Sequence, residues 1–333
     1  MTFLTERFLS VRRQNFCDIE IETPKTNLLN RHKEKVVKMY KPKRRSLLFI
    51  PANNPRFCER VLQSEVDTII YDLEDSIPDS AKEQGRELLA QIFPQNYDGS
   101  KELCIRINGP RTPFYQKDLS LISKLVPHAI MLPKIESRKE VQELDVFLNS
   151  CDTFARKKIE IIGLIETPKG AYKLREVLYS SHRITAVALG AEDLSYELGV
   201  ERGGPLEKHP LLNHIQIELA LVARMHNMQC IGPIERGYTQ EKHLSFLEEE
   251  CKYLRKINLQ GKLAIHPSQL PIINKYFDIT SEEIKEANRT IGLFKEAEKT
   301  GSAVITNGNE MQDTPSLRRS LELVKYAKEH GFG

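Results

Sequence analysis

The stretch Ser46–Pro55, SLLFIPANNP, opens the part of the chain that decides the fold. It begins with a short apolar, strand-like run, and the turn that follows lacks the GxGxxG pattern expected after the first strand of a doubly wound sheet. Seven more strand-like runs follow, separated by segments of helical periodicity, which is typical of parallel strands with helical crossovers. Eight such units favour a closed (β/α)₈ TIM barrel over the alternative, a doubly wound sheet. The runs span residues 46–50, 68–72, 103–108, 129–132, 159–165, 186–190, 229–232 and 262–265.

Two extensions flank the predicted barrel, which we place at residues 44–278. Residues 1–43 form an N-terminal extension that ends in the basic cluster KMYKPKRR, which runs into the barrel. Residues 279–333 are predicted to form two helices joined by a polar lid, SAVITNGNEMQD, which carries Asp313. Thr280 and Glu283 make a capping box for the first helix, and Thr314 with Pro315 is expected to begin the second.

The composition excludes several classes of protein. The chain has 333 residues, 40% of them hydrophobic, which is enough for one large core. Its formal net charge is only +3 with charges dispersed along the chain, so no nucleic-acid partner is expected. No apolar run reaches the roughly 18 residues needed to span a bilayer, so no membrane segment is expected.

The cysteine pattern indicates the cellular compartment of the protein and the redox state of its thiols. The six cysteines form no CxxC pair, and we interpret them as reduced thiols of a cytoplasmic protein. The alternative is the mitochondrial matrix, because the first sixteen residues weakly resemble a presequence.

Polar side chains gather directly after the predicted strands. In a barrel of this kind the chemistry lies at the carboxyl ends of the strands, so these residues should meet at one mouth. They are Asp72, Glu74 and Asp75, then Arg106, Lys134, Glu166, Glu192, Asp193 and His266.

Several carboxylates facing one another repel unless a cation holds them, so the pattern favours a hard divalent ion with oxygen ligands. Mg²⁺ fits best and Mn²⁺ is a possible substitute, whereas zinc is disfavoured because no HxxxH or Cys/His cluster is present.

Three of these residues also have structural interpretations. Asp75 precedes Ser76 and is equally well explained as a helix N-cap. Arg106 can instead form a structural ion pair. For His266 we prefer a structural role, turning the chain before Pro267.

Eight motifs carry a family resemblance. The runs RRSLLFIPANNP, DLEDS, IRIN, LPKIES, GLIETPKG, LGAEDL, GKLAIHPSQ and NEMQDTPSLRR occur in this order between Arg44 and Arg319. Together they resemble the citrate lyase β-subunit-like (CitE-like) and malyl-CoA lyase family of the HpcH/HpaI aldolase superfamily.

The resemblance implies a role for each matching residue. Glu166 and Asp193 would bind Mg²⁺, with Glu74 and Asp75 supporting its water shell. Arg106 would contact the keto acid and the enolate oxygen, and Asp313 of a neighbouring subunit would transfer the proton. The backbone around Ala191 and Glu192 would hold the keto-acid carboxylate. From charge alone, Arg44 and in particular Arg45 are expected to meet coenzyme A phosphates.

The function that follows is a Mg²⁺-dependent carbon–carbon lyase. It would convert a short carboxylated 3-hydroxyacyl-CoA into a 2-oxo acid and an acyl-CoA such as acetyl-CoA, or run in reverse, as a homo-oligomer of the trimeric type common in the family. One alternative is a citrate lyase β subunit that acts on an acyl-carrier-protein thioester within a complex. Another is a non-catalytic acyl-CoA sensor. The chain departs from many relatives at Ala52 and in the loop Gly232–Arg236 after the seventh strand, which leaves the acyl group open.

Overall fold

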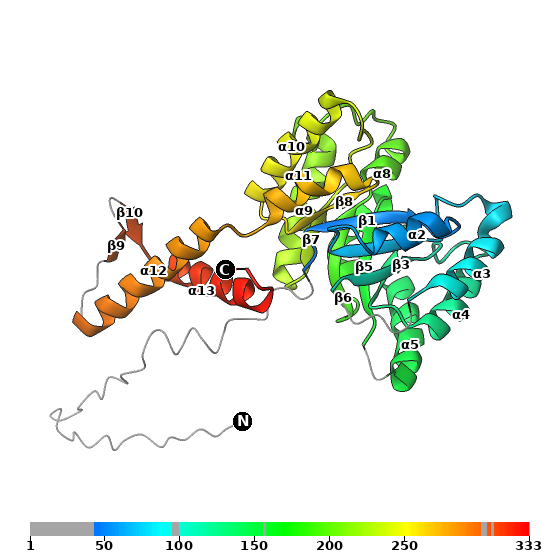
Figure 1. Ribbon diagram of the computed structural model, residues 1–333, viewed down its shortest axis with the longest axis horizontal. Helices are drawn as coiled ribbons and strands as arrows, with labels where there is room; N and C mark the ends of the chain where they lie inside the picture. The colour runs from blue at the N-terminus through cyan, green and yellow to red at the C-terminus, as the bar shows by residue number, and fades with distance from the viewer. Residues whose placement is uncertain (1–42, 95–99, 156–157, 301–304, 308–309, 333) are drawn as a thin grey trace, which may run out of the picture.

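The computed structural model describes residues 43–94, 100–155, 158–300, 305–307 and 310–332. Figure 1 shows a barrel of strands surrounded by helices, from which a C-terminal arm of two helices projects. None of the described helices is both long and apolar enough to cross a membrane.

Eight parallel strands close into a barrel in chain order. The last strand pairs with the first, with Ser46 opposite Lys262, so the sheet has no free edge and the doubly wound alternative is wrong. The strand bounds agree with the predicted runs to within two residues. The strands are β1 (Ser46–Pro51), β2 (Thr68–Asp72), β3 (Glu102–Arg106), β4 (Ala129–Leu132), β5 (Glu160–Ile165), β6 (Ile184–Leu189), β7 (Gln229–Gly232) and β8 (Gly261–Ala264).

Helices form the outer ring. Most have a buried apolar stripe and an exposed polar face, as expected of helices that cover a sheet on one side only. Between the strands lie α2 (Pro55–Val61), α3 (Lys82–Ile92), α4 (Tyr115–Leu125), α5 (Arg138–Ala155), α6 (Pro168–Tyr172), α7 (Leu174–Leu178), α8 (Ala191–Glu197), α9 (Pro210–Met225) and α10 (Glu241–Lys256), and α11 (Leu270–Phe277) follows β8. Short 3₁₀ turns lie at Asp79–Ala81, Leu206–Lys208 and Pro267–Gln269.

Two hydrophobic layers result from the alternation of side chains along each strand. Leu48 and Ile50 point outward and pack under the helices, whereas Leu47 points into the barrel. The inner layer is completed by small and medium side chains, including Ile70, Cys104, Ala129, Met131, Ile162, Leu164, Ala186, Ala188, Ile231 and Leu263. Because these side chains fill the interior of the barrel, any site is confined to the ends of the barrel.

A buried ion-pair network fills the amino end of the barrel. Arg44 is fully buried and bonds Glu102 and Glu160, whose Oε2 lies 2.8 Å from Arg44 Nη2. Arg45 bonds Asp67 and Asp278 through atoms 2.9 Å apart. Both arginines therefore lie at the opposite end of the barrel from the carboxyl ends of the strands. The expectation that Arg44 and Arg45 bind coenzyme A at the mouth is wrong, because a residue that precedes a strand lies at its amino end.

The C-terminal arm consists of α12 (Ser281–Thr300) and α13 (Thr314–Glu329), with the short strands β9 (Ile305–Asn307) and β10 (Glu310–Gln312) between them. The capping box of Thr280 and Glu283 is confirmed, since each backbone N–H donates to the other's side chain at 2.8 and 3.1 Å. The start of α13 is one residue earlier than predicted. The N-cap is Asp313 and not Thr314, because the Asp313 carboxylate accepts from the Ser316 backbone N–H at 2.9 Å.

The arm joins the barrel at its amino end. Arg45 lies 5.9 Å from the centre of the Phe332 ring, and Arg224 Nη2 lies 3.3 Å from Glu322 Oε2. Within the arm, Ile291 and Phe294 pack against Leu317. The N-terminal end of α13 therefore points away from the barrel, as Figure 1 shows.

The cysteines of the described part of the chain are free and buried, as the spacing predicted. They are Cys58, Cys104, Cys151, Cys230 and Cys251, whereas Cys17 lies outside the described residues. Burial raises the pKa of the Cys58 thiol to about 12, which makes an inert side chain of it.

Candidate active site

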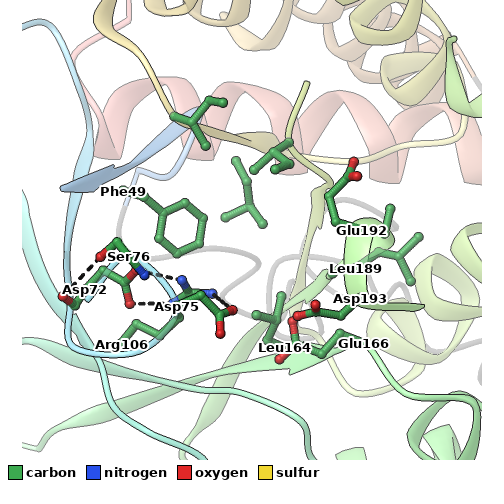
Figure 2. A pocket seen from close by; sticks show the side chains of 15 residues that line it. Phe49, Asp72, Asp75, Ser76, Arg106, Leu164, Glu166, Leu189, Glu192 and Asp193 are labelled. Atoms are coloured by element: carbon green, nitrogen blue, oxygen red, sulfur yellow. Dashed lines mark hydrogen bonds and ion pairs between the residues drawn. The ribbon is translucent and has the colours of Figure 1, made fainter. Parts of the chain in front are cut away.

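A pocket of about 250 Å³ lies at the carboxyl ends of the strands. Figure 2 shows Asp72, Asp75 and Arg106 on one side of it and Glu166 and Asp193 on the other. Its apolar floor is made by the side chains of Phe49, Leu164, Leu189, Ile234, Leu263 and Ile265. The volume suits a small organic acid rather than a whole coenzyme A molecule.

Arg106 is fixed by acids on one wall of the pocket. Strand register places Arg106 beside Asp72. The two side chains form a bidentate ion pair, with Nε–Oδ1 and Nη2–Oδ2 distances of 2.7 and 2.6 Å. Glu74 and Asp75 lie 3.1 and 3.5 Å from its Nη1, and the guanidinium carbon lies 4.6 Å from the centre of the Phe49 ring. These contacts lock the orientation of Arg106 while leaving it on the pocket surface.

Charge on this wall is set by the same contacts. Burial alone would raise the pKa of Asp72, but Arg106 outweighs it and holds that pKa below its usual value. Burial, reinforced by the charge of Asp75, raises the pKa of Glu74 to about 7. Asp75 is exposed and does not cap a helix, so its interpretation as an N-cap is wrong.

Glu166 and Asp193 form the opposite wall. Glu166 follows β5 and is 2% exposed, and its Oε1 accepts a hydrogen bond from the Lys134 backbone N–H at 2.9 Å. Gly190 makes room for it, because a Cβ at that position would lie 2.4 Å from Glu166 Oε2. Asp193 lies in the first turn of α8 and is partly exposed. Burial and the nearby charge of Glu74 raise the pKa of Glu166 well above its usual value.

This wall fits a magnesium ion. Among the described residues, no group of three or more histidine, cysteine, aspartate or glutamate side chains is arranged to hold a metal. Mg²⁺, however, usually takes only one or two protein carboxylates and completes its shell with waters and substrate oxygens. Buried Glu166 lies close to the carboxylate of Asp193, and burial and the charge of Glu74 raise its pKa, which favours a cation beside it. Glu74 Oε2 lies 3.1 Å from Arg106 Nη1 but accepts no hydrogen bond, so it can accept one from a water molecule of the ion.

Lys134 lies between the two walls. Its Nζ is 2.9 Å from Glu74 Oε1, 3.6 Å from Asp75 and 3.7 Å from Asp193. Burial lowers the pKa of Lys134, but Glu74 first, and then Asp75 and Glu166, raise it overall. Lys134 was predicted to lie at the mouth, but no role was assigned to it from the sequence.

The Glu192 side chain is held away from the wall that Glu166 and Asp193 form. Its carboxylate bonds buried Arg202 on one side and lies 2.7 Å from Nε of the exposed Arg236 on the other. Arg202 in turn bonds buried Glu250, with Nη2 and Oε1 3.2 Å apart. This chain of charges fixes the segment that begins with Ala191, whose backbone borders the pocket. The residues Arg202 and Glu250 were missed, since nothing in the sequence marks them as neighbours of the mouth.

Two further residues lie outside the pocket. His266 caps the turn Pro267–Gln269 and stacks on Tyr238 with ring centres 4.3 Å apart, which agrees with the structural role preferred for it. Asp313 is exposed in the arm, roughly 20 Å along α13 from Tyr326 near the amino end of the barrel. The structure therefore brings together the residues expected at the mouth, except His266, Arg44, Arg45 and Asp313.

A closed parallel barrel with an acidic pocket and one fixed arginine at the carboxyl ends of its strands defines a TIM-barrel protein with an enzyme-like site. More specifically, the chain belongs to the HpcH/HpaI aldolase/citrate lyase family, whose model matches residues 45–267.

Individual relatives agree with this assignment. The citrate lyase subunit beta of Leuconostoc mesenteroides subsp. cremoris is 27% identical, covering 85% of this chain and 93% of that protein. A (3S)-malyl-CoA thioesterase of Cereibacter sphaeroides is 29% identical, covering 87% of this chain and 96% of that protein. The solved structure of Mycobacterium tuberculosis CitE with magnesium, acetoacetate and coenzyme A has the same fold, with a TM-score of 0.68 and 24% identity over 88% of this chain and all of that chain.

Proposed function

We propose that this protein is a Mg²⁺-dependent carbon–carbon lyase. Its substrate is a short carboxylated 3-hydroxyacyl-CoA, and its products are a 2-oxo acid and an acyl-CoA such as acetyl-CoA. The observation that carries the proposal is the pocket of about 250 Å³ in which Glu166 and Asp193 face a fixed Arg106. The relatives support it, because they include a citrate lyase subunit and an enzyme named for malyl-CoA.

The residues divide the reaction between them. Glu166 and Asp193 would hold a Mg²⁺ ion, or Mn²⁺ in its place, and the bound ion would act as a Lewis acid toward the oxygen that becomes the ketone of the 2-oxo acid. Arg106, held rigid by Asp72, stabilises the negative charge that develops on the thioester oxygen as the carbon–carbon bond breaks. The backbone at Ala191 and Glu192 holds the carboxylate of the 2-oxo acid, and Glu74 and Asp75 orient water beside Arg106.

Proton transfer to the enolate carbon belongs to Asp313 of a neighbouring subunit. In its own chain Asp313 lies in an arm that leaves the barrel at the end opposite the pocket, so it cannot serve the pocket of the same chain in this arrangement. The active unit is therefore a homo-oligomer, and a cyclic trimer fits arms exchanged around an axis.

A second function is favoured by one observation. The relative from Cereibacter sphaeroides is named a thioesterase, and that name denotes cleavage of a thioester and not of a carbon–carbon bond. The two functions differ in their products. The lyase releases a 2-oxo acid and leaves the thioester intact, whereas the thioesterase releases a free coenzyme A thiol.

Binding of small 2-oxo acids tests the substrate class. We expect pyruvate, glyoxylate or oxaloacetate to bind in an isothermal titration only when Mg²⁺ is present, because the ion and the acid share the pocket. Asp193→Asn should lose this binding. If none of the three acids binds with Mg²⁺ present, while an acyl-CoA still does, the protein is an acyl-CoA sensor and the lyase proposal is wrong.

A further inference from the structure

The backbone of Lys134 is strained. It has a φ of +50°, in the left-handed region that residues with a side chain rarely adopt. Such a conformation persists only where the surrounding structure imposes it, and it occurs often at functional sites. Here the conformation serves two contacts at once: the backbone N–H donates to Glu166 Oε1, and the side chain reaches Glu74.

The ammonium group of Lys134 lies close to three carboxylates of the pocket. Its three carboxylate neighbours come from both walls of the pocket, Glu74 and Asp75 from the segment after β2 and Asp193 from α8. Arg106, the other cation of the pocket, also contacts Glu74 and Asp75 but has no ion pair with Asp193 or Glu166 in the described structure. Lys134 therefore forms ion pairs with carboxylates of both walls, whereas Arg106 forms them with one wall only.

We propose that Lys134 is a built-in counter-ion of the metal site and weakens the binding of the divalent ion. The inference rests on the proposed function, because it takes Glu166 and Asp193 as the ion's ligands. The Lys134 ammonium and the ion share one carboxylate, Asp193, so two positive charges would lie near each other and repel. In return, the ammonium holds the two acidic walls together whether or not an ion is bound.

This role predicts opposite effects on metal affinity and stability. Lys134→Met keeps the length of the side chain and removes its charge. We expect it to bind Mn²⁺ alone roughly tenfold more tightly, measured by electron paramagnetic resonance of the free ion. In chelator the same variant should unfold at a lower temperature, because the acids lose their counter-ion, and Mn²⁺ should raise its midpoint more than that of the parent protein.

Matched variants separate this role from a purely structural one. Lys134→Arg keeps the charge and should bind Mn²⁺ as the parent does. Lys169→Met removes a nearby exposed lysine that pairs with Glu136 instead, and it should change neither quantity. A merely structural Lys134 would give a Met variant with weaker Mn²⁺ binding as well as lower stability.

Two failures remain distinguishable. If Glu166→Gln abolishes Mn²⁺ binding while Lys134→Met binds it with unchanged or lower affinity, the counter-ion role is wrong and the metal site stands. If Glu166→Gln binds Mn²⁺ like the parent protein, the metal site is wrong and the role of Lys134 falls with it.

Discussion

Replacing Glu166 by glutamine should abolish Mg²⁺ binding and lower lyase turnover about 10³-fold or more. The ion supplies charge stabilisation that Arg106 alone does not reach, and loss of one such contribution typically costs two to three orders of magnitude. The amide keeps the shape of the side chain and can still accept the hydrogen bond from the Lys134 backbone. Turnover and Mg²⁺ titration of the purified variant measure both effects.

The same substitution, Glu166→Gln, should not lower the stability of the fold in the absence of a divalent ion. Since the pKa of Glu166 in the folded protein lies above its unfolded value, folding favours the protonated form, and that stabilisation is lost as pH rises through the folded pKa. At pH 8 in chelator, Glu166→Gln carries no such charge and should be at least as stable as the parent.

Glu160→Gln is the matched control for this variant. It weakens a partner of buried Arg44 at the other end of the barrel, so it should cost about 1–2 kcal/mol of stability and leave metal binding intact. Full activity of Glu166→Gln in excess chelator would show that Glu166 holds no catalytic ion.

Mixing two inactive variants should restore activity. Asp313→Ala should lower turnover by about 10²–10⁴-fold, as expected when a proton-transferring group is removed. If Asp313 serves a neighbour's pocket, subunit exchange with Glu166→Gln creates sites that combine an intact metal site with an intact arm. In an equal mixture about a quarter of the sites should be whole, and turnover should recover to that fraction.

Two controls make the complementation interpretable. Exchange is followed by mass spectrometry of tagged subunits, and a mixture of Asp313→Ala with Asp313→Asn should stay inactive, since neither chain brings an intact arm. A mixture of the complementary variants that exchanges fully yet stays inactive would mean that Asp313 acts within its own chain or not at all.

The strands were predictable because their sequence signal is local. The run TIIYD was placed at residues 68–72 without error, since β-prone residues are bounded there by a turn on one side and acidic loop residues on the other. The convergence of Asp72, Arg106 and Glu166 followed from the rule that carboxyl ends of parallel strands meet at one mouth.

The failures concern properties that are not local. Arg45 was assigned by charge alone, although its place before β1 puts it at the wrong end of the barrel. The left-handed backbone of Lys134 is imposed by its partners, and no residue type near it signals the conformation. Likewise, the contacts from Glu192 through Arg202 to Glu250 join two helices and a loop that only the closed barrel brings together.

The most direct test of the lyase proposal is the identity of the products formed from malyl-CoA, citramalyl-CoA and related 3-hydroxyacyl-CoA thioesters. With Mg²⁺, we predict equal amounts of a 2-oxo acid and a shortened acyl-CoA from at least one of them, seen by mass spectrometry, with no free thiol and no reaction in chelator. Release of free coenzyme A with the hydroxy acid intact, or cleavage that continues without a divalent ion, would contradict the account.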